Sequence, residues 1–293
     1  MADQSCTDLQ HNQCLRNGYF YEVIVIKKQH IVLENSYEGY LFCPAHPREP
    51  TQCIIVFHER YGLVQHTFDV CTRLAKEGYL VLAPDLFSLW DGDKESLKRG
   101  EVRAIVSDKD CREQLDTWLD YMKAQSSGAR DLQVILMGVC QSGRYPIVIA
   151  SERTDITACV IFYGAAHDRD WATNKLQPLS MPMMIEKLTA PLLFVFAERD
   201  HTISMDNVSR IRAAIEATNL SYRMKVIPEV PHGFLNDTMP GRYRPEQAEE
   251  AWRYLLRFLT DVFDGGWPKD NVEWELQCIR SKTYNFAENT RME

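Results

Sequence analysis

The chain has 293 residues, of which 45% are hydrophobic and 25% are charged. This is the composition of an ordinary globular protein, and it excludes a disordered or fibrous chain. The net charge is −8 at pH 7, and the basic residues do not cluster along the sequence. That charge argues against binding to nucleic acid or to anionic lipid, so the expected partner is a small molecule.

The first residues, MADQSCTDLQHNQ, are acidic and amide-rich where a secretory signal would place basic residues and then an apolar stretch. No apolar run reaches the ~18 residues needed to cross a bilayer. The nine cysteines include no CxxC pair, and Cys53 and Cys159 lie within apolar runs, where a thiol packs as a small hydrophobic group. We therefore expect a cytoplasmic protein with reduced thiols and no contact with a membrane.

The strand candidates come in two groups. After residues 1–18, which lack apolar periodicity and are expected to form an N-terminal arm, Tyr21–Ile26 and Tyr37–Phe42 are expected to pair as antiparallel strands. Short, continuous apolar runs separated by helical stretches then follow. These runs are Cys53–Phe57, Tyr79–Ala83, Val134–Met137, Ala158–Tyr163, Leu192–Ala197 and Tyr222–Ile227. Unbroken apolar strands alternating with helices are typical of an α/β fold with a mostly parallel sheet covered on both faces.

The helical stretches carry start and stop signals. Ser107 can cap a helix together with the carboxylate three residues later, Pro245 suits the first turn of the last long helix, and Gly78 is a natural helix stop. No repeat or low-complexity linker divides the chain. Residues 19–263 are therefore expected to form one domain, and residues 264–293 a tail that packs on the body or on a partner subunit. The chain is expected to be a monomer or a homodimer.

The sharpest local signal is VILMGVCQSG, residues 134–143. It predicts a buried strand, a tight turn of small residues around Cys140, and then a helix. This is the strand-to-helix elbow that carries the nucleophile of α/β-hydrolases, with cysteine where serine usually stands. A helix N-terminus at that point favours a thiolate and offers backbone N–H groups to an oxyanion. Taken alone, the segment also fits a structural cysteine at the end of a strand.

Two further residues follow in the order nucleophile, acid, histidine. Asp200 comes directly after one predicted strand and His232 after the next, so each projects from the carboxyl end of a parallel strand, where open α/β sheets build their sites. Singly, a loop aspartate is usually a cap and a loop histidine is usually solvent-exposed. Their joint placement with Cys140 predicts a catalytic triad.

With these residues, the sequence resembles the dienelactone hydrolases, cysteine-dependent members of the α/β-hydrolase superfamily. The resemblance covers residues 38–263. It rests on FHERYGL (57–63), GYLVLAPDLF (78–87), GVCQSG (138–143), FYG (162–164), ERDH (198–201) and PHGFLND (231–237). It implies the α/β-hydrolase fold and a triad of Cys140, His232 and Asp200 that hydrolyses a lactone or ester through an acyl-enzyme, without a cofactor or a metal.

The resemblance also assigns supporting residues. In the family, a glutamate after the first core strand interacts with the resting cysteine, and Glu59 occupies that place. A carboxylate near a thiol can accept its proton, although Glu59 can equally be a loop carboxylate paired with Arg60. The family's oxyanion donors imply the backbone N–H groups of Gln141 and Arg60 here.

The sequence departs from the family at the substrate's carboxylate. The two arginines that hold it in the family are replaced by Leu89 and Asn236, and neither can anchor a carboxylate in bidentate fashion. If no other arginine substitutes, neutral lactones and esters, or acidic ones whose carboxylate lies elsewhere, are expected to be processed better than dienelactone. The candidate substitutes are Arg60, Arg99, Arg103, Arg144 and Arg242.

The elbow and its surroundings also differ from the family pattern. Ser142 replaces the usual glycine, and Arg144 and Tyr145 replace small residues, which predicts a remodelled pocket. Candidate substrate-binding residues are Trp90, Arg144, Tyr145 and Tyr163, although aromatic residues in such loops can instead close over the core. Two other functions stay open for the same fold. One is an isomerase or carbon–carbon bond-cleaving enzyme that uses the same cysteine, and the other is a ligand-binding pseudoenzyme.

Overall fold

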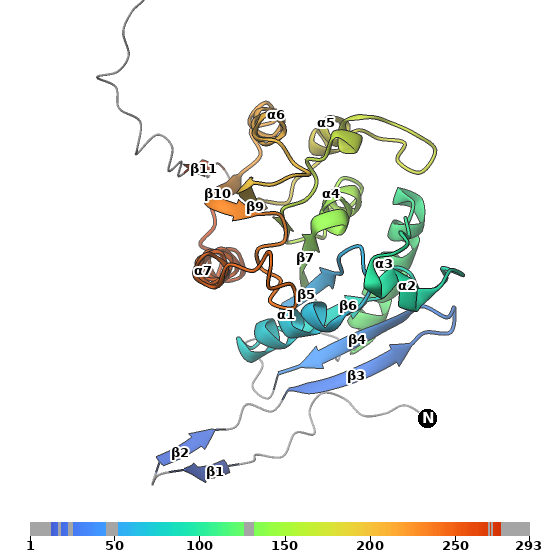
Figure 1. Ribbon diagram of the computed structural model, residues 1–293, viewed down its shortest axis with the longest axis vertical. Helices are drawn as coiled ribbons and strands as arrows, with labels where there is room; N and C mark the ends of the chain where they lie inside the picture. Colours follow the sequence, from blue (N-terminus) through green and yellow to red (C-terminus); the bar gives the residue numbers. More distant parts are fainter. Residues whose placement is uncertain are drawn as a thin grey trace, which may run out of the picture.

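The computed structural model describes residues 13–16, 19–22, 26–44, 52–125, 132–268, 270 and 272–276 (Figure 1). Nine strands in this part of the chain form one sheet in the order β11-β10-β9-β8-β7-β5-β6-β4-β3. Every neighbouring pair from β6 across to β11 is parallel, whereas β3 pairs with β4, and β4 with β6, in antiparallel fashion. Strands β1 and β2 form a separate antiparallel pair.

The strands are β1 (Gln13–Arg16), β2 (Tyr19–Glu22), β3 (Lys27–Val32), β4 (Glu38–Cys43), β5 (Gln52–Phe57), β6 (Leu80–Pro84), β7 (Gln133–Val139), β8 (Ala158–Phe162), β9 (Leu192–Arg199), β10 (Tyr222–Pro231) and β11 (Val272–Leu276). The helices are α1 (Gln65–Lys76), α2 (Lys94–Arg99), α3 (Asp108–Gln125), α4 (Arg144–Ala150), α5 (Met181–Ile185), α6 (Met205–Glu216) and α7 (Pro245–Phe263), with short 3-10 turns η1 (Cys140–Gly143) and η2 (Asp168–Trp171).

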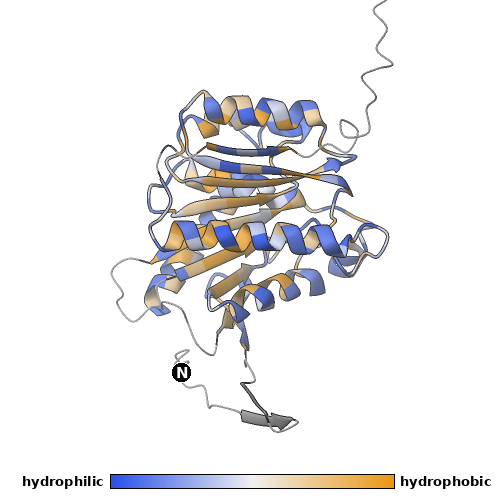
Figure 2. Cartoon of the chain, turned by 90° about the vertical axis from the view of Figure 1, so that its left-hand side faces the viewer, coloured by the Kyte–Doolittle hydropathy of each residue, from blue (hydrophilic) through white to orange (hydrophobic). Residues whose placement is uncertain are grey.

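Helices cover both faces of the sheet, as the sequence predicts. Helices α1 and α7 pack with one set of strand side chains, and α3, α4, α5 and α6 pack with the other set. In Figure 2 the central strands are largely hydrophobic, whereas the helices mix hydrophobic and hydrophilic residues. All residues of β5 and β8 are buried, because a parallel strand between two helical layers has no solvent-facing side.

The six predicted parallel strands correspond to β5 through β10, and the three helices with sequence signals are confirmed. In α3, the Asp110 amide donates to Ser107 Oγ at 3.0 Å, which is the predicted N-terminal cap. Pro245 begins α7, and Gly78 follows α1 with a left-handed φ of 96°. Because these signals are local, they are readable without knowledge of the rest of the chain.

The predicted pairing of Tyr21–Ile26 with the strand at Tyr37–Phe42 is wrong. The partner of β4 is β3, Lys27–Val32, while Tyr19–Glu22 forms β2 and pairs with β1. Strand β3 is an edge strand whose residues alternate between half-buried and exposed. Its polar sequence KKQHIV therefore carries little of the hydrophobic signal by which strands are recognised.

The tail contributes a strand to the sheet. Strand β11 pairs in parallel with β10, and the indole N–H of Trp267 donates to Ser221 Oγ at 2.8 Å. This part of the predicted tail, residues 264–293, therefore packs on the body of the same chain. Residues 277–293, like residues 1–12 of the predicted arm, lie outside the described residues.

The structure bears on two further predictions, the absence of a membrane-spanning segment and the reduced state of the cysteines. None of the helices in the described ranges is long and apolar enough to cross a membrane. Among the residues that the structure describes, the free thiols are Cys53, Cys71, Cys111, Cys140 and Cys159. Cys43 is disulfide-bonded, so the expectation of fully reduced thiols does not hold at that position.

Candidate active site

The turn after β7 places Cys140 in a strained conformation. Cys140 has a positive φ of 58°, a left-handed conformation that costs a non-glycine residue about 1–3 kcal/mol. Small neighbours make the turn sterically possible. A Cβ on Gly138 would lie 2.5 Å from the Ser142 carbonyl oxygen, and one on Gly143 would lie 2.7 Å from Gly164 Cα. The close approach of turn and neighbouring loop is the predicted elbow, and it holds the thiol at the carboxyl end of the sheet.

Ser142 connects this elbow to the neighbouring strand. Its hydroxyl lies 3.0 Å from the carbonyl oxygen of Phe57 and 2.9 Å from that of Val139, and it accepts the Val139 N–H at 3.1 Å. The side chain is buried. The serine that departs from the family's glycine thus ties the end of β5 to the end of β7.

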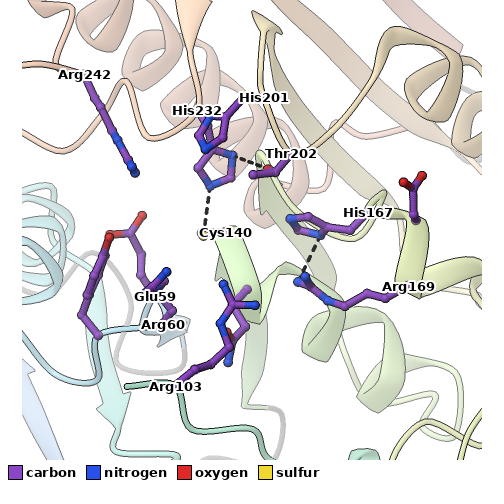
Figure 3. A pocket seen from close by; sticks show the side chains of 13 residues that line it. Glu59, Arg60, Arg103, Cys140, His167, Arg169, His201, Thr202, His232 and Arg242 are labelled. Carbon is purple, nitrogen blue, oxygen red and sulfur yellow. Dashed lines mark hydrogen bonds between the residues drawn. The ribbon is translucent and has the colours of Figure 1, made fainter. Parts of the chain in front are cut away.

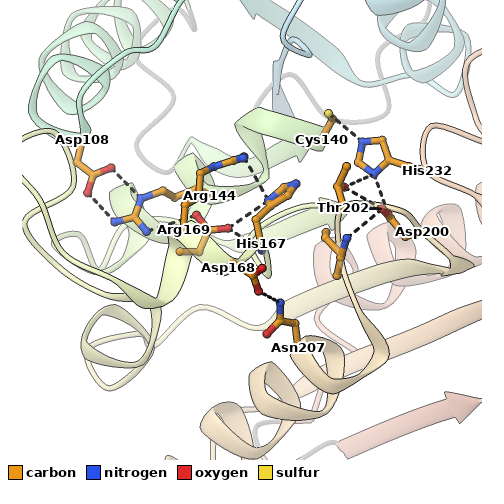
Figure 4. A network of polar contacts seen from close by, with 12 residues as sticks. Asp108, Cys140, Arg144, His167, Asp168, Arg169, Asp200, Thr202, Asn207 and His232 are labelled. Atoms are coloured by element: carbon orange, nitrogen blue, oxygen red, sulfur yellow. Dashed lines mark hydrogen bonds and ion pairs between the residues drawn. The ribbon is translucent and has the colours of Figure 1, made fainter.

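Cys140, His232 and Asp200 form a continuous hydrogen-bonded chain (Figure 4). The Cys140 sulfur lies 3.0 Å from His232 Nε2, and His232 Nδ1 lies 2.6 Å from Asp200 Oδ2. The other oxygen of Asp200 accepts the backbone N–H groups of Thr202 at 2.7 Å and Ile203 at 3.1 Å. The carboxylate is thereby fixed with one oxygen aimed at the histidine.

The charges of the histidine and the aspartate stabilise each other. Burial alone would lower the pKa of His232, but its hydrogen bonds to Asp200 and Cys140 raise that pKa to about 10. Burial alone would raise the pKa of Asp200, but His232 and the Thr202 hydrogen bonds hold it below its usual value. The imidazole is therefore protonated at neutral pH, and an imidazolium beside a sulfur favours the nucleophilic thiolate.

Glu59 is 5% exposed and lines the same cavity as Cys140. Its carboxylate accepts a hydrogen bond from the Asn236 side-chain amide at 3.0 Å, and Asn236 in turn accepts the Thr238 N–H at 3.1 Å. The Arg60 guanidinium donates instead to the carbonyl oxygen of Gly100, at 2.6 Å. The alternative pairing of Glu59 with Arg60 is therefore not the arrangement found here.

A cavity of about 350 Å³ opens above the sulfur (Figure 3). Its wall includes both proposed oxyanion residues, Gln141 and Arg60, together with His232 and Glu59. Its volume suits a small ligand. The wall also includes residues that the sequence did not single out, among them His167, Arg169 and Thr202.

Four arginines surround this cavity. Arg60, Arg103 and Arg242, three of the five candidate substitutes for the family's carboxylate anchors, line it together with Arg169. The other two candidates have carboxylate partners elsewhere. Arg99 Nε lies 2.8 Å from Glu101, and Arg144 Nη2 lies 2.7 Å from Asp108. Three candidate anchors for a carboxylate therefore lie in the wall of the cavity beside Cys140.

None of the four residues predicted to bind substrate belongs to the described wall of this cavity. Trp90 packs against the core, and the Tyr145 hydroxyl donates to the Val106 carbonyl oxygen at 3.0 Å. The buried ring of Tyr163 stands edge-on to His232, with centroids 5.0 Å apart. Arg144 is buried in its ion pair. Arg144 and Tyr145 line a smaller, adjoining cavity.

The cavity residues that the sequence analysis missed differ in whether the local sequence carries a signal for them. Thr202 follows Asp200 by two positions, the spacing at which an aspartate accepts from the local backbone, so a signal for it was present. His167 and Arg169 sit in the loop after β8, where His167 Nδ1 lies 3.2 Å from Asp170, and nothing in the local sequence indicates that this loop reaches the elbow. No group of three His, Cys, Asp or Glu side chains in the described ranges is placed to hold a metal ion.

Comparisons with known proteins identify the family of this chain. The sequence model of the dienelactone hydrolase family matches residues 37–263. An Escherichia coli K12 protein, provisionally named carboxymethylenebutenolidase, is 29% identical over 216 residues, covering 72% of this chain and 77% of that protein. A Methylorubrum extorquens protein with the same provisional name is 30% identical over 211 residues, which is 70% of each chain. The crystal structure of a provisionally named dienelactone hydrolase from Klebsiella pneumoniae has a TM-score of 0.70 and 26% identity, covering 82% of this chain and 99% of that one.

Proposed function

Because the chain belongs to the dienelactone hydrolase family and is a hydrolase acting on lactone or ester bonds, we propose that Cys140, His232 and Asp200 are its catalytic triad. The observation that carries this proposal is the chain of hydrogen bonds from Asp200 through His232 to the Cys140 sulfur. A positioned base next to a nucleophile, itself oriented by a third group, is the arrangement that covalent acyl transfer needs.

In the first half-reaction, the Cys140 thiolate attacks the carbonyl carbon of the substrate. The carbonyl oxygen becomes an oxyanion, which the backbone N–H groups of Gln141 and Arg60 stabilise by hydrogen bonds. The tetrahedral intermediate collapses, the bond to the leaving oxygen breaks, and His232 donates its proton to that oxygen. The product is a thioester on Cys140. When the substrate is a lactone, the leaving hydroxyl stays attached to the acyl chain.

In the second half-reaction, His232 is neutral and acts as general base toward a water molecule. The water oxygen attacks the thioester carbonyl and its proton passes to His232 Nε2, which regenerates the thiolate and the imidazolium as the acid leaves. Asp200 holds the ring by accepting from Nδ1 and stabilises each imidazolium that forms. Each turnover consumes one water and breaks one acyl–oxygen bond.

Glu59 is the proposed acceptor for the thiol proton before substrate binds. It lies in the wall of the same cavity, and its hydrogen-bond donor is a neutral amide rather than an arginine. A carboxylate without a fixed cation retains its ability to take up a proton. Glu59 thus supports the conversion of any remaining thiol to thiolate as the substrate enters.

The test combines product analysis with a nucleophile variant. Hydrolysis of 4-nitrophenyl acetate or a γ-lactone in ¹⁸O-water is expected to place one ¹⁸O atom in the acid product, and intact mass spectrometry is expected to detect an acyl adduct on Cys140. The Cys140→Ala variant is expected to lose turnover while keeping its melting temperature, because only the nucleophile is removed. Wild-type turnover in that variant, or conversion without ¹⁸O incorporation as an isomerase would give, would overturn the proposal.

A further inference from the structure

The wall of the active-site cavity on the Gln141 side carries two arginines that form no ion pair with a described carboxylate. Arg103, Arg169 and Gln141 line both the main cavity and an adjoining small cavity of about 60 Å³. The two spaces therefore meet beside Gln141, whose backbone N–H is a proposed oxyanion donor. A space of this size holds a group of a few heavy atoms, since one water molecule occupies about 30 Å³.

The two arginines differ from the others in their partners. The Arg103 guanidinium has no hydrogen bond or ion pair with any described residue, and the Arg169 guanidinium has one contact, to His167 Nδ1 at 3.3 Å. The acidic neighbour Asp168 is turned to a different partner, since its Oδ1 accepts from Asn207 at 2.7 Å. Figure 4 places that contact on the side of Asp168 away from Arg169. The charge of Asp170 also acts on Arg169, but neither guanidinium is held in an ion pair, so both can bind a ligand.

The adjoining cavity also contains a buried guanidinium. Arg144 is 2% exposed and uses its Nε and Nη2 to bind Asp108, at 2.9 and 2.7 Å. Its Nη1 has no hydrogen-bond acceptor, and the nearest carboxylate oxygen recorded for it is that of Asp170, at 3.7 Å. A buried N–H without an acceptor is unfavourable, and Arg144 lines this cavity, so an acceptor that enters it can bind that N–H.

We propose that Arg103 and Arg169 are the specificity-determining residues of this site, and that they bind the carboxylate of an acidic ester or lactone beside Gln141. The proposal rests on the proposed function and moves the anchor of that carboxylate from the position used in the family to another part of the cavity wall. The site differs from the family's anchor position, which Asn236 occupies next to Glu59. In Figure 3, Arg169 and Glu59 lie on opposite sides of Cys140. Two arginine forks compensate the desolvation of a carboxylate through charge-assisted hydrogen bonds.

The probes are 4-nitrophenyl monoesters of succinate, glutarate and adipate, each compared with the 4-nitrophenyl ester of the straight-chain monoacid with the same number of carbons. The wild-type enzyme is expected to prefer at least one of the acidic esters by tenfold or more in kcat/KM, which is about 1.4 kcal/mol. Because both arginines are exposed, the preference should also shrink as ionic strength rises.

Two variants locate the anchor. Arg103→Gln and Arg169→Gln are each expected to lower kcat/KM for the preferred acidic ester about tenfold, mainly through KM, and to affect the matched neutral ester much less. Arg99→Gln is the matched control, because that arginine is exposed and paired with Glu101; both substrates should keep their wild-type rates.

The possible failures are distinguishable. Hydrolysis of the neutral esters without a preference for the acidic ones would overturn the carboxylate anchor and leave the triad standing. A preference that is lost in Arg242→Gln but kept in Arg103→Gln and Arg169→Gln would place the anchor on the Glu59 side and overturn this assignment. If the wild-type enzyme hydrolyses neither ester nor lactone, the proposed function itself fails.

Discussion

The carboxylate of Glu59 accepts a hydrogen bond from the side-chain amide of Asn236 at 3.0 Å, and both residues are buried. The family pattern has an arginine at the position of Asn236. With an amide there, the buried acid has a neutral partner on this side, and the position that holds the substrate's carboxylate in the family instead positions a residue of the enzyme.

This contact predicts a pH-dependent destabilisation. In Asn236→Asp a second carboxylate would face Glu59, and at neutral pH the two buried negative charges would repel each other. Melting temperature is expected to fall by several degrees at pH 7. It should recover part of the loss at pH 5, where one of the two carboxyl groups takes up a proton. An equal loss at both pH values would show that the two side chains do not interact through charge.

Removing the acid of the triad should impair catalysis without changing the fold. Asp200→Asn is expected to lower kcat by about 10³- to 10⁴-fold, because an amide neither stabilises the imidazolium nor holds the same tautomer. Steady-state kinetics on one good ester, beside a melting curve, make the measurement. The nearby Glu198 is a poor replacement, because its carboxylate accepts the Glu229 N–H at 2.9 Å. A loss of only a few-fold would mean that another acid supports His232.

The raised pKa of His232 predicts the pH range over which this histidine stays protonated. A pKa of about 10 means that the imidazolium is present at pH values below that value and is lost as pH rises through it. The ring nitrogens of His232 should therefore keep the NMR chemical shifts of an imidazolium between pH 7 and pH 9. In Asp200→Asn the imidazolium loses its anionic partner, so the change to the neutral ring should occur at lower pH. A wild-type ring that loses its proton near the ordinary histidine value would contradict the stabilisation by Asp200.

The close contact behind the elbow predicts a steric effect. In Gly143→Ala the new Cβ would lie 2.7 Å from Gly164 Cα, and backbone atoms cannot move aside as a flexible side chain can. Overpacking of this kind typically costs 1–3 kcal/mol, about 2–4 °C per kcal/mol in melting temperature for a domain of this size. Activity should fall as well, because the turn carries Cys140. The control is Gly241→Ala, which has no atom within 4 Å of the added Cβ and should leave both quantities unchanged.

Sequence reasoning succeeded where the signal is local and failed where it depends on tertiary contacts. The buried strands β5 to β10 are readable because each is a continuous apolar run between helices. Strands β3 and β11 are not, because an edge strand needs few apolar residues. Arg144 follows the nucleophile closely in sequence, which favoured a substrate contact. Its actual partner, Asp108, is 36 positions away, and no local pattern indicates that pairing.

The same dependence on tertiary contacts explains why the sequence did not indicate that Arg103 and Arg169 lie at one cavity. Arg103 precedes α3 and Arg169 follows β8, and only the folded sheet brings these two loops to one cavity. The proposed triad could be named from the sequence because its three members follow a chain order that is typical of the fold. The anchors of a substrate obey no such order, since any loop at the carboxyl edge can supply them.

Strand β11 also determines where the chain can be shortened. Arg223 and Lys225, on β10, are 2% and 5% exposed, and each has two carboxylate partners. One partner of each lies on α7, and the other, Glu273 or Glu275, lies on β11. A protein truncated after Gly266 would keep every residue of the proposed triad. It would also lose one carboxylate partner of each of these two cations and leave the amides of β10 open to strand pairing between molecules, which is a common start of aggregation.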